Sequence, residues 1–325
     1  SFSYGLIFNI LLSLIMLVLA FILFGNGNQL LIVSLFTLRL FGLFLLEQAK
    51  AEVRGKHDNK KFGQIEIYSN ILLLVSAVLS AYIFGVKGYV FSLCLSPFVV
   101  LFIHRFKISF DRTLFKNFTE KSFWKFCVTM AFTNQVSELI FLLDVFFIGI
   151  FLDNSAVAHY RIYSIIPFNL FFLAALFFQT AYPKLCENHQ NNQYQLQFLF
   201  NFWKLMVPIT ILIFAVSYFG AEYILTLFGN DYAENPKVFK ILIVASISVL
   251  LLRTPFGYLL ASKGKSIYNL IAALISILSL LVLIKPTISN FGIEGVAWLS
   301  LVNLFFIGIF QMISYFYLVY RAPKL

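Results

Sequence analysis

The chain has 325 residues, of which 61% are apolar and only 12% are charged, and its mean hydropathy is +0.89. Because soluble domains carry about 25% charged residues, this composition excludes a soluble protein and indicates a membrane protein. The net charge of +10 does not indicate a nucleic-acid partner, since its cations lie between apolar runs. No G-x-x-x-x-G-K-[ST] stretch occurs, which argues against nucleotide hydrolysis.

Apolar runs long enough to cross about 30 Å of hydrocarbon predict ten spans. Each span must satisfy its own backbone at that depth, so helices are expected, and the uniform Leu, Ile and Phe content lacks the alternation of a barrel. An N-terminal lobe over 1–121 holds four spans and a basic cytoplasmic linker: 4–24, 29–47, 65–84 and 88–104. A C-terminal lobe over 122–325 holds six: 122–151, 158–182, 204–228, 238–260, 267–288 and 293–320.

The connections between spans alternate between basic and nearly uncharged. Sixteen cations fall on one side: Lys50, Arg54, Lys56, Lys60, Lys61, Arg105, Lys107, Arg112, Lys116, Lys121, Lys184, Lys204, Lys263, Lys265, Arg321 and Lys324. The other side has three, Lys87, Lys237 and Lys285. Cytoplasmic loops are the ones enriched in Lys and Arg. The asymmetry predicts that both ends of this chain are cytoplasmic.

The pentapeptide F-G-[VI]-x-G occurs twice, at 84–88 and 291–295, and each copy joins two apolar runs. A Gly-Lys pair precedes each copy by one span, at 55–56 and at 264–265. Equal order and orientation indicate a parallel duplication about an axis along the membrane normal. Since the first lobe has two spans fewer than the second, we expect about 86 residues to precede Ser1 and the intact protein to have twelve spans.

Ionisable residues inside spans are costly unless they are paired or hydrated. Arg39, Arg253 and Glu138, with Asn134 one turn from Glu138, have no partner within their own hairpins. They therefore predict a water-filled interior, in which Arg39 and Glu138 form a gate between the lobes.

Asp144 and Arg161 flank the LDNS turn almost symmetrically and are expected to pair, as a structural tether or as part of a functional site.

Other residues predict structural roles. Cys94, Cys127 and Cys186 lack metal-type spacing, and the four histidines are spread over both sides, so neither a metal nor a cofactor is expected. Trp203 stands near a span end, as interfacial anchors do. Pro255 lies within a span and predicts a kink.

Two stretches carry a family resemblance: "FGNDYAENPKVFKILIVASISVLLLRTPFGYLLASKGK" at 228–265, and "LLDVFFIGIFLDNSAVAHYRIYSIIP" at 142–167. They resemble bacterial polysaccharide and O-antigen flippases, the Wzx-type branch of the multidrug/oligosaccharidyl-lipid/polysaccharide (MOP) exporter superfamily, and the likeness covers essentially the whole chain. The resemblance implies an all-α, MATE-like, V-shaped carrier of two six-helix lobes in the bacterial cytoplasmic membrane, the first lobe lacking two helices here.

The substrate that the resemblance implies is a polyprenyl-diphosphate-linked oligosaccharide, moved from the inner to the outer leaflet. Arg39, Arg161 and Arg253 suit its diphosphate or an acidic sugar, with Glu138, Asp144 and Asn134 in gating or ion-pair roles. Membrane lipid and polysaccharide polymerase or assembly proteins are the partners it suggests, and nucleic acid is not.

Other functions remain open. A drug/cation antiporter of the same fold would use Glu138 and Asp144 as its ion site, and a peptidoglycan-precursor (lipid II) flippase usually has fourteen spans. A membrane polysaccharide polymerase or ligase would need a sizeable outer loop carrying Arg and His, whereas the outer connections here are short. A structural scaffold would explain the spans but not the charges inside them.

Overall fold

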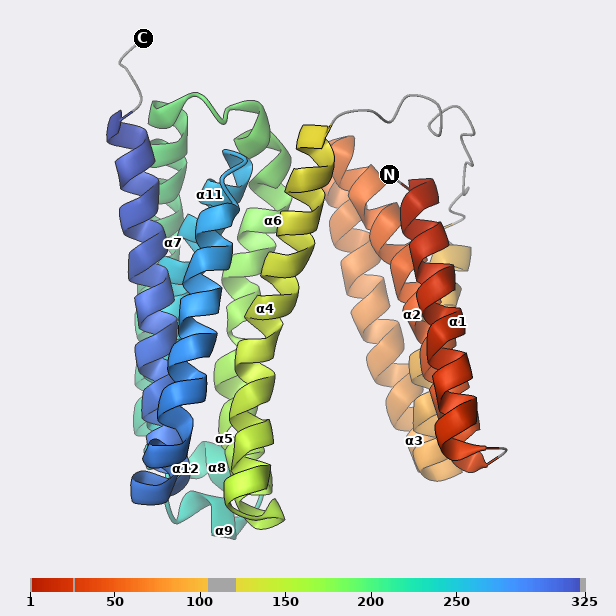
Figure 1. Cartoon of the computed structure of the whole chain (residues 1–325). Coiled ribbons are helices and arrows are strands. Elements are labelled where there is room, and N and C mark those ends of the chain that lie inside the picture. The colour runs from red at the N-terminus through yellow and green to blue at the C-terminus, as the bar shows by residue number, and fades with distance from the viewer. Residues whose placement is uncertain (1, 26, 105–120, 322–325) are drawn as a thin grey trace. The chain divides into compact units, whose positions relative to one another are not determined.

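The computed structural model describes residues 2–25, 27–104 and 121–321, and throughout these ranges the regular structure is helical (Figure 1). The predicted all-α class is therefore confirmed. The linker cations Arg105, Lys107, Arg112 and Lys116, and Lys324 in the tail, lie outside the described residues.

The chain divides into two compact units, residues 1–119 and 120–325. Unit 1 contains α1 (Phe2–Phe24), α2 (Asn28–Gly55) and α3 (Asn59–Ile103), and α2 packs against both of its neighbours. Unit 2 contains α4 (Lys121–Phe151), α5 (Asn154–Asn169), α6 (Phe171–Glu187), α7 (Asn192–Phe219), α8 (Ala221–Thr226), α9 (Asn230–Ala233), α10 (Lys237–Ser248), a π-helical turn (Val249–Arg253), α11 (Thr254–Ser262) and α12 (Ile267–Arg321).

Within the described residues, eight helical stretches are long and apolar enough to cross a membrane. Two of them, α3 with 45 residues and α12 with 55, are about twice the length that about 30 Å of hydrocarbon requires. Each is interrupted by a glycine outside helical geometry, Gly85 in α3 and Gly292 in α12. Division at these glycines gives ten helical segments, as many as the spans predicted from the sequence, and the bounds of those spans stay a prediction.

The repeated pentapeptide builds these two interruptions. Gly85 has φ +62° and ψ −148°, and Gly292 has φ +57° and ψ −141°, a backbone region that is essentially restricted to glycine. A Cβ atom on Gly88 would lie 2.2 Å from the Ser80 carbonyl oxygen, although eight residues of straight helix span about 12 Å. The chain therefore turns back on itself at Gly85, and the last glycine of the motif lets the returning helix pack against the first.

The second copy has the same construction, since a Cβ atom on Gly295 would lie 2.8 Å from the Thr287 carbonyl oxygen. Figure 1 shows the resulting hairpin in α12. The loop before each hairpin also has one residue at positive φ, His57 at +57° and Gly264 at +70°. His57 and Gly264 are 207 positions apart, as are Gly85 and Gly292, so the counterpart of Gly264 is His57 and not the predicted Gly55.

Pro255 interrupts the helix from α10 to α11 by a different mechanism. Proline has no N–H, so Pro255 cannot donate a hydrogen bond to the Leu251 carbonyl four positions earlier. The chain forms a π-helical turn over Val249–Arg253, immediately before this proline. The orphaned Leu251 carbonyl accepts a hydrogen bond of 2.9 Å from the Trp203 indole nitrogen of α7. The Trp203 indole therefore bonds to this break within unit 2, and its expected role as an interfacial anchor stays a prediction.

Candidate functional site

Arg253 lies at the end of the π-helical turn, where α12 approaches closely. A Cβ atom on Gly308 of α12 would lie 2.8 Å from the Leu252 Cβ atom and 3.1 Å from the Arg253 backbone nitrogen, so only glycine permits this packing. Arg253 is half-buried, and its guanidinium stands 5.3 Å from the centre of the Phe141 ring of α4. The π-helical turn and α4 thus fix the position of a cation within a membrane-spanning segment.

Glu138 belongs to the same site, because it lies one turn before Phe141 on α4 and acts electrostatically on Arg253. The two charges do not form a salt bridge within 4.0 Å in the part of the chain that the structure describes. Asn134 lies one further turn along α4, and both Glu138 and Asn134 are exposed on unit 2. The structure therefore brings Glu138 near Arg253, with Asn134 one turn from Glu138 on α4.

Asp144 is 1% exposed, and its partners differ from the predicted one. Its Oδ2 atom accepts a hydrogen bond of 3.1 Å from the Tyr160 hydroxyl of α5 and another from the Ser300 hydroxyl of α12. Successive residues of a helix point about 100° apart, so with Tyr160 facing Asp144 the next residue, Arg161, is directed away and is exposed. The expected pairing of Asp144 with Arg161 was wrong, although both residues do lie beside the capped LDNS turn.

The turn itself follows from its sequence. The Asp153 side chain accepts a hydrogen bond of 2.7 Å from the Ala156 backbone nitrogen and caps the start of α5. Asp is among the preferred N-cap residues because it satisfies backbone N–H groups that lack a partner in the first turn.

Arg39 lies in α2 of unit 1, where it is half-buried and acts electrostatically on Cys94 of α3. Its predicted pairing with Glu138 would join the two units and stays a prediction, as does the water-filled interior between the lobes.

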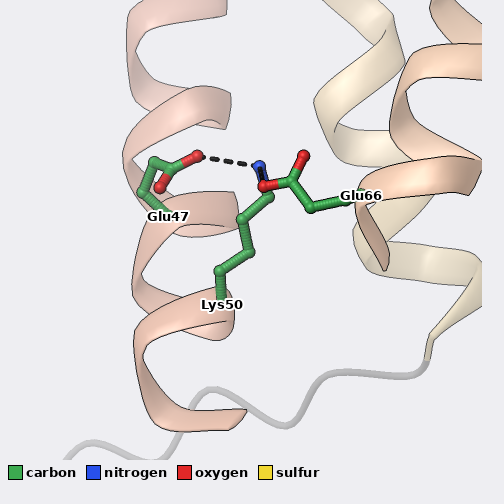
Figure 2. A network of polar contacts seen from close by, with 3 residues as sticks. All are labelled: Glu47, Lys50 and Glu66. Carbon is green, nitrogen blue, oxygen red and sulfur yellow. Dashed lines mark hydrogen bonds and ion pairs between the residues drawn. The ribbon is translucent and has the colours of Figure 1, made fainter. Parts of the chain in front are cut away.

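A second charged group in unit 1 was missed. Figure 2 shows the Lys50 Nζ atom between two carboxylates, 2.9 Å from Glu47 Oε1 and 2.9 Å from Glu66 Oε1. Lys50 was expected in a loop, but α2 continues to Gly55 and leaves only three residues before α3 begins at Asn59. The signal that pointed to it was the spacing of Glu47 and Lys50, which places them on one face of a helix.

The end of unit 2 at which α7 begins and α11 ends has a cation held by neutral groups. Lys263 donates to the His189 carbonyl at 2.9 Å and to Asn192 Oδ1 at 2.7 Å, and its Nζ atom lies 5.9 Å from the centre of the Tyr315 ring. Burial lowers the pKa of the Lys263 ammonium group. This arrangement connects α7, α11 and α12 and is structural in character.

Helices of membrane length, glycine hairpins and charges inside the spans define a multi-pass membrane protein with a transporter fold. The solved structure of a mutant of the Vibrio cholerae MATE transporter VcmN is similar, with a TM-score of 0.78 and 16% identity over 99% of this chain and 78% of that one. A MOP superfamily transporter from Pyrococcus furiosus gives 0.72 and 15%, over 98% and 77%. An outward-facing multidrug resistance MATE family transporter gives 0.65 and 14%, over 100% and 78%.

The chain belongs to the polysaccharide biosynthesis protein family, whose model matches residues 1–237. The polysaccharide biosynthesis family and the MATE-like fold that the resemblance implied are thereby confirmed, and the solved structures that share the fold are described as transporters. No curated protein matches the sequence.

Proposed function

We propose that the protein moves a polyprenyl-diphosphate-linked oligosaccharide from the inner to the outer leaflet of the bacterial cytoplasmic membrane. Membership of the polysaccharide biosynthesis family supports a glycan precursor as substrate, and the fold supports its movement across a membrane. The ends of this chain are cytoplasmic in this proposal, and polysaccharide polymerase or assembly proteins take up the product.

The environment of Arg253 carries the proposal. A guanidinium has five N–H donors, yet within the described residues its contacts are limited to the face of the Phe141 ring and the field of Glu138. An arginine inside a span is costly unless it has a hydrated or anionic partner. Its planar donors bind phosphate oxygens in pairs, so a diphosphate headgroup supplies the partner that the protein does not.

Glu138 supports the reversible step that a carrier needs. A binding site that holds its substrate too tightly cannot release it, and a nearby carboxylate weakens the attraction of Arg253 for an anion. In this proposal Asn134 offers an amide to the sugar, while Arg39 and the exposed Arg161 supply further cations along the route of the headgroup. The gate between Arg39 and Glu138 is part of this proposal.

Replacement of Arg253 by Ala is expected to reduce surface polysaccharide at equal abundance of the protein in the membrane. Arg253→Lys should restore only part of the export, because it keeps the charge without the paired donors. Arg54→Ala is a matched control, since Arg54 also stands 5.3 Å from a phenylalanine ring, that of Phe62, but at the end of α2. Full export by Arg253→Ala would remove the cationic site from the mechanism.

A drug/cation antiporter is the second candidate, because Asp144 is a buried carboxylate in a fold shared with MATE transporters. Deletion of the gene separates the two. Accumulation of lipid-linked repeat units on the cytoplasmic side supports the flippase, whereas increased drug sensitivity with normal glycans supports the antiporter. Accumulation of peptidoglycan precursors would instead indicate a lipid II flippase.

A further inference from the structure

Asp144 has one carboxylate oxygen with partners and one without. The Oδ2 atom accepts from Tyr160 and Ser300, whereas the Oδ1 atom is buried and has no hydrogen-bond partner within the described part of the chain. Arg161 follows Tyr160 on α5, and its charge interacts electrostatically with the Tyr160 hydroxyl. Among the described residues it forms no salt bridge with Asp144. An isolated ionised carboxylate in an apolar interior is unfavourable by several kcal/mol, so the site calls for a positive species at Oδ1.

Other charged side chains near α4 do not supply it. On α10, which packs against α5 and α12, Lys240 Nζ lies 5.1 Å from the centre of the Tyr218 ring of α7. Over the ranges that the structure describes, Asp144 forms no hydrogen bond or salt bridge with Lys237 of α10 or with Lys285 and Glu294 of α12. The carboxylate and two hydroxyls offer too few oxygens to bind a sodium ion, because hard metal cations of this kind take about six oxygen ligands.

A row of polar side chains, buried except for the half-buried Ser279, leads from Asp144 along the two arms of α12. Ser300 contacts Asp144, Ser279 donates to Asn303 Oδ1, and Gln311 donates to Asn269 Oδ1 at 3.0 Å. Ser276 lies one turn before Ser279 on the first arm of α12, between Asn269 and Ser279 in the sequence. We call these six residues, Asn269, Ser276, Ser279, Ser300, Asn303 and Gln311, the α12 polar row.

The α12 polar row is incompletely paired. Within the described residues, Ser276 Oγ, Asn303 Nδ2 and Gln311 Oε1 are all buried and have no hydrogen-bond partner, and each residue is at most 4% exposed. Native interiors pair the great majority of such groups with protein or with ordered water. The eleven residue steps from Ser300 to Gln311 extend about 16 Å along the helix, roughly half of the hydrocarbon thickness.

We propose that Asp144 binds a proton at Oδ1 and that water along the α12 polar row connects it with the end of unit 2 where α12 begins. Binding takes one proton from water and changes the carboxylate from −1 to neutral, and release returns it. The Tyr160 and Ser300 hydroxyls join α4, α5 and α12 at this carboxyl group, so its protonation alters a contact between three helices. The inference goes beyond the proposed function and does not depend on the identity of the substrate.

Infrared difference spectroscopy on the purified full chain in liposomes tests the site directly, without substrate. A protonated-carboxyl band should appear as the pH falls and should be lost in Asp144→Asn. If that variant is lost from the membrane, Asp144→Glu serves instead and should shift the band. A band that survives unchanged in either variant overturns the proposal, as does a band that sodium removes at fixed pH, since the site would then bind a metal cation.

The role of the α12 polar row is tested by the exchange of this band after transfer to D₂O. The double substitution Ser276→Ala/Asn303→Leu removes two of the unpaired groups and should slow the exchange several-fold. Ser217→Ala, a buried serine of α7, is the matched control and should exchange as the wild type does. Exchange in the double variant at the wild-type rate would refute the row as the path.

Discussion

Replacement of Lys50 by Met tests whether the ion pairs of unit 1 stabilise it, and which pair does so. The Lys50 side chain is 8% exposed, Glu66 is 23% exposed and Glu47 is 59% exposed. Removing one partner of a buried pair typically costs about 3–5 kcal/mol, because the other charge stays buried. Glu66 keeps some access to water, so we expect about 2–3 kcal/mol for Lys50→Met, below that range.

The two carboxylates should differ in the same measurement. Glu47 is solvated and pairs with Lys50 within one helix, an interaction worth at most about 0.5 kcal/mol. Glu47→Gln should therefore have little effect, whereas Glu66→Gln should cost about 1–2 kcal/mol because it removes the contact between α2 and α3. The double variant Lys50→Met/Glu66→Met leaves only the solvated Glu47 and should recover most of the loss.

The assay is reversible unfolding of the full chain in mixed detergent micelles, with the free energy of unfolding compared across the four variants. The reasoning is refuted if Glu47→Gln is as destabilising as Glu66→Gln. It is refuted equally if the double variant is less stable than Lys50→Met, because the cost would then come from lost packing and not from an unpaired carboxylate.

Three further predictions concern the hairpins, the topology and the end of unit 2 that carries Lys263. Gly88→Ala should prevent close packing of the α3 hairpin and lower the yield of folded protein, since its Cβ atom would lie 2.2 Å from a backbone oxygen. A Cβ atom on Gly63 would meet nothing within 4 Å, so Gly63→Ala should be neutral or slightly stabilising. Equal yields of the two variants would contradict the packing argument. In a background without the three native cysteines, cysteines introduced at Asn154 and at Val86, which is 78% exposed, should react with an impermeant reagent from outside. A cysteine introduced at Asp58 should react only after permeabilisation. Labelling of position 58 in intact cells would reverse the topology. Lys263→Ala should lower the free energy of unfolding by about 1–2 kcal/mol, because it leaves the His189 carbonyl and Asn192 without their donor. Lys265 is an exposed cation nearby, and Lys265→Ala should not lower this free energy. The same loss in both variants would assign the effect to net charge.

The sequence by itself determined the membrane-spanning helices and the two hairpins of this protein. Hydrocarbon thickness sets the length of an apolar run, and the need to pair every backbone group inside a membrane makes that run a helix. A glycine at positive φ and a second glycine at a close helix contact are both local requirements, so F-G-[VI]-x-G predicts a turn wherever it joins two such runs.

Only the tertiary structure decided which polar groups meet. Asp144 contacts Ser300, which is 156 positions away, and not the nearby Arg161, because the rotation of α5 directs Tyr160 inward. Lys50 is a buried cation and not a loop cation, because α2 extends beyond its apolar run and places Lys50 beside Glu66 of α3. Helix rotation and helix neighbours depend on packing over the whole unit, and composition or spacing along one segment does not contain that information.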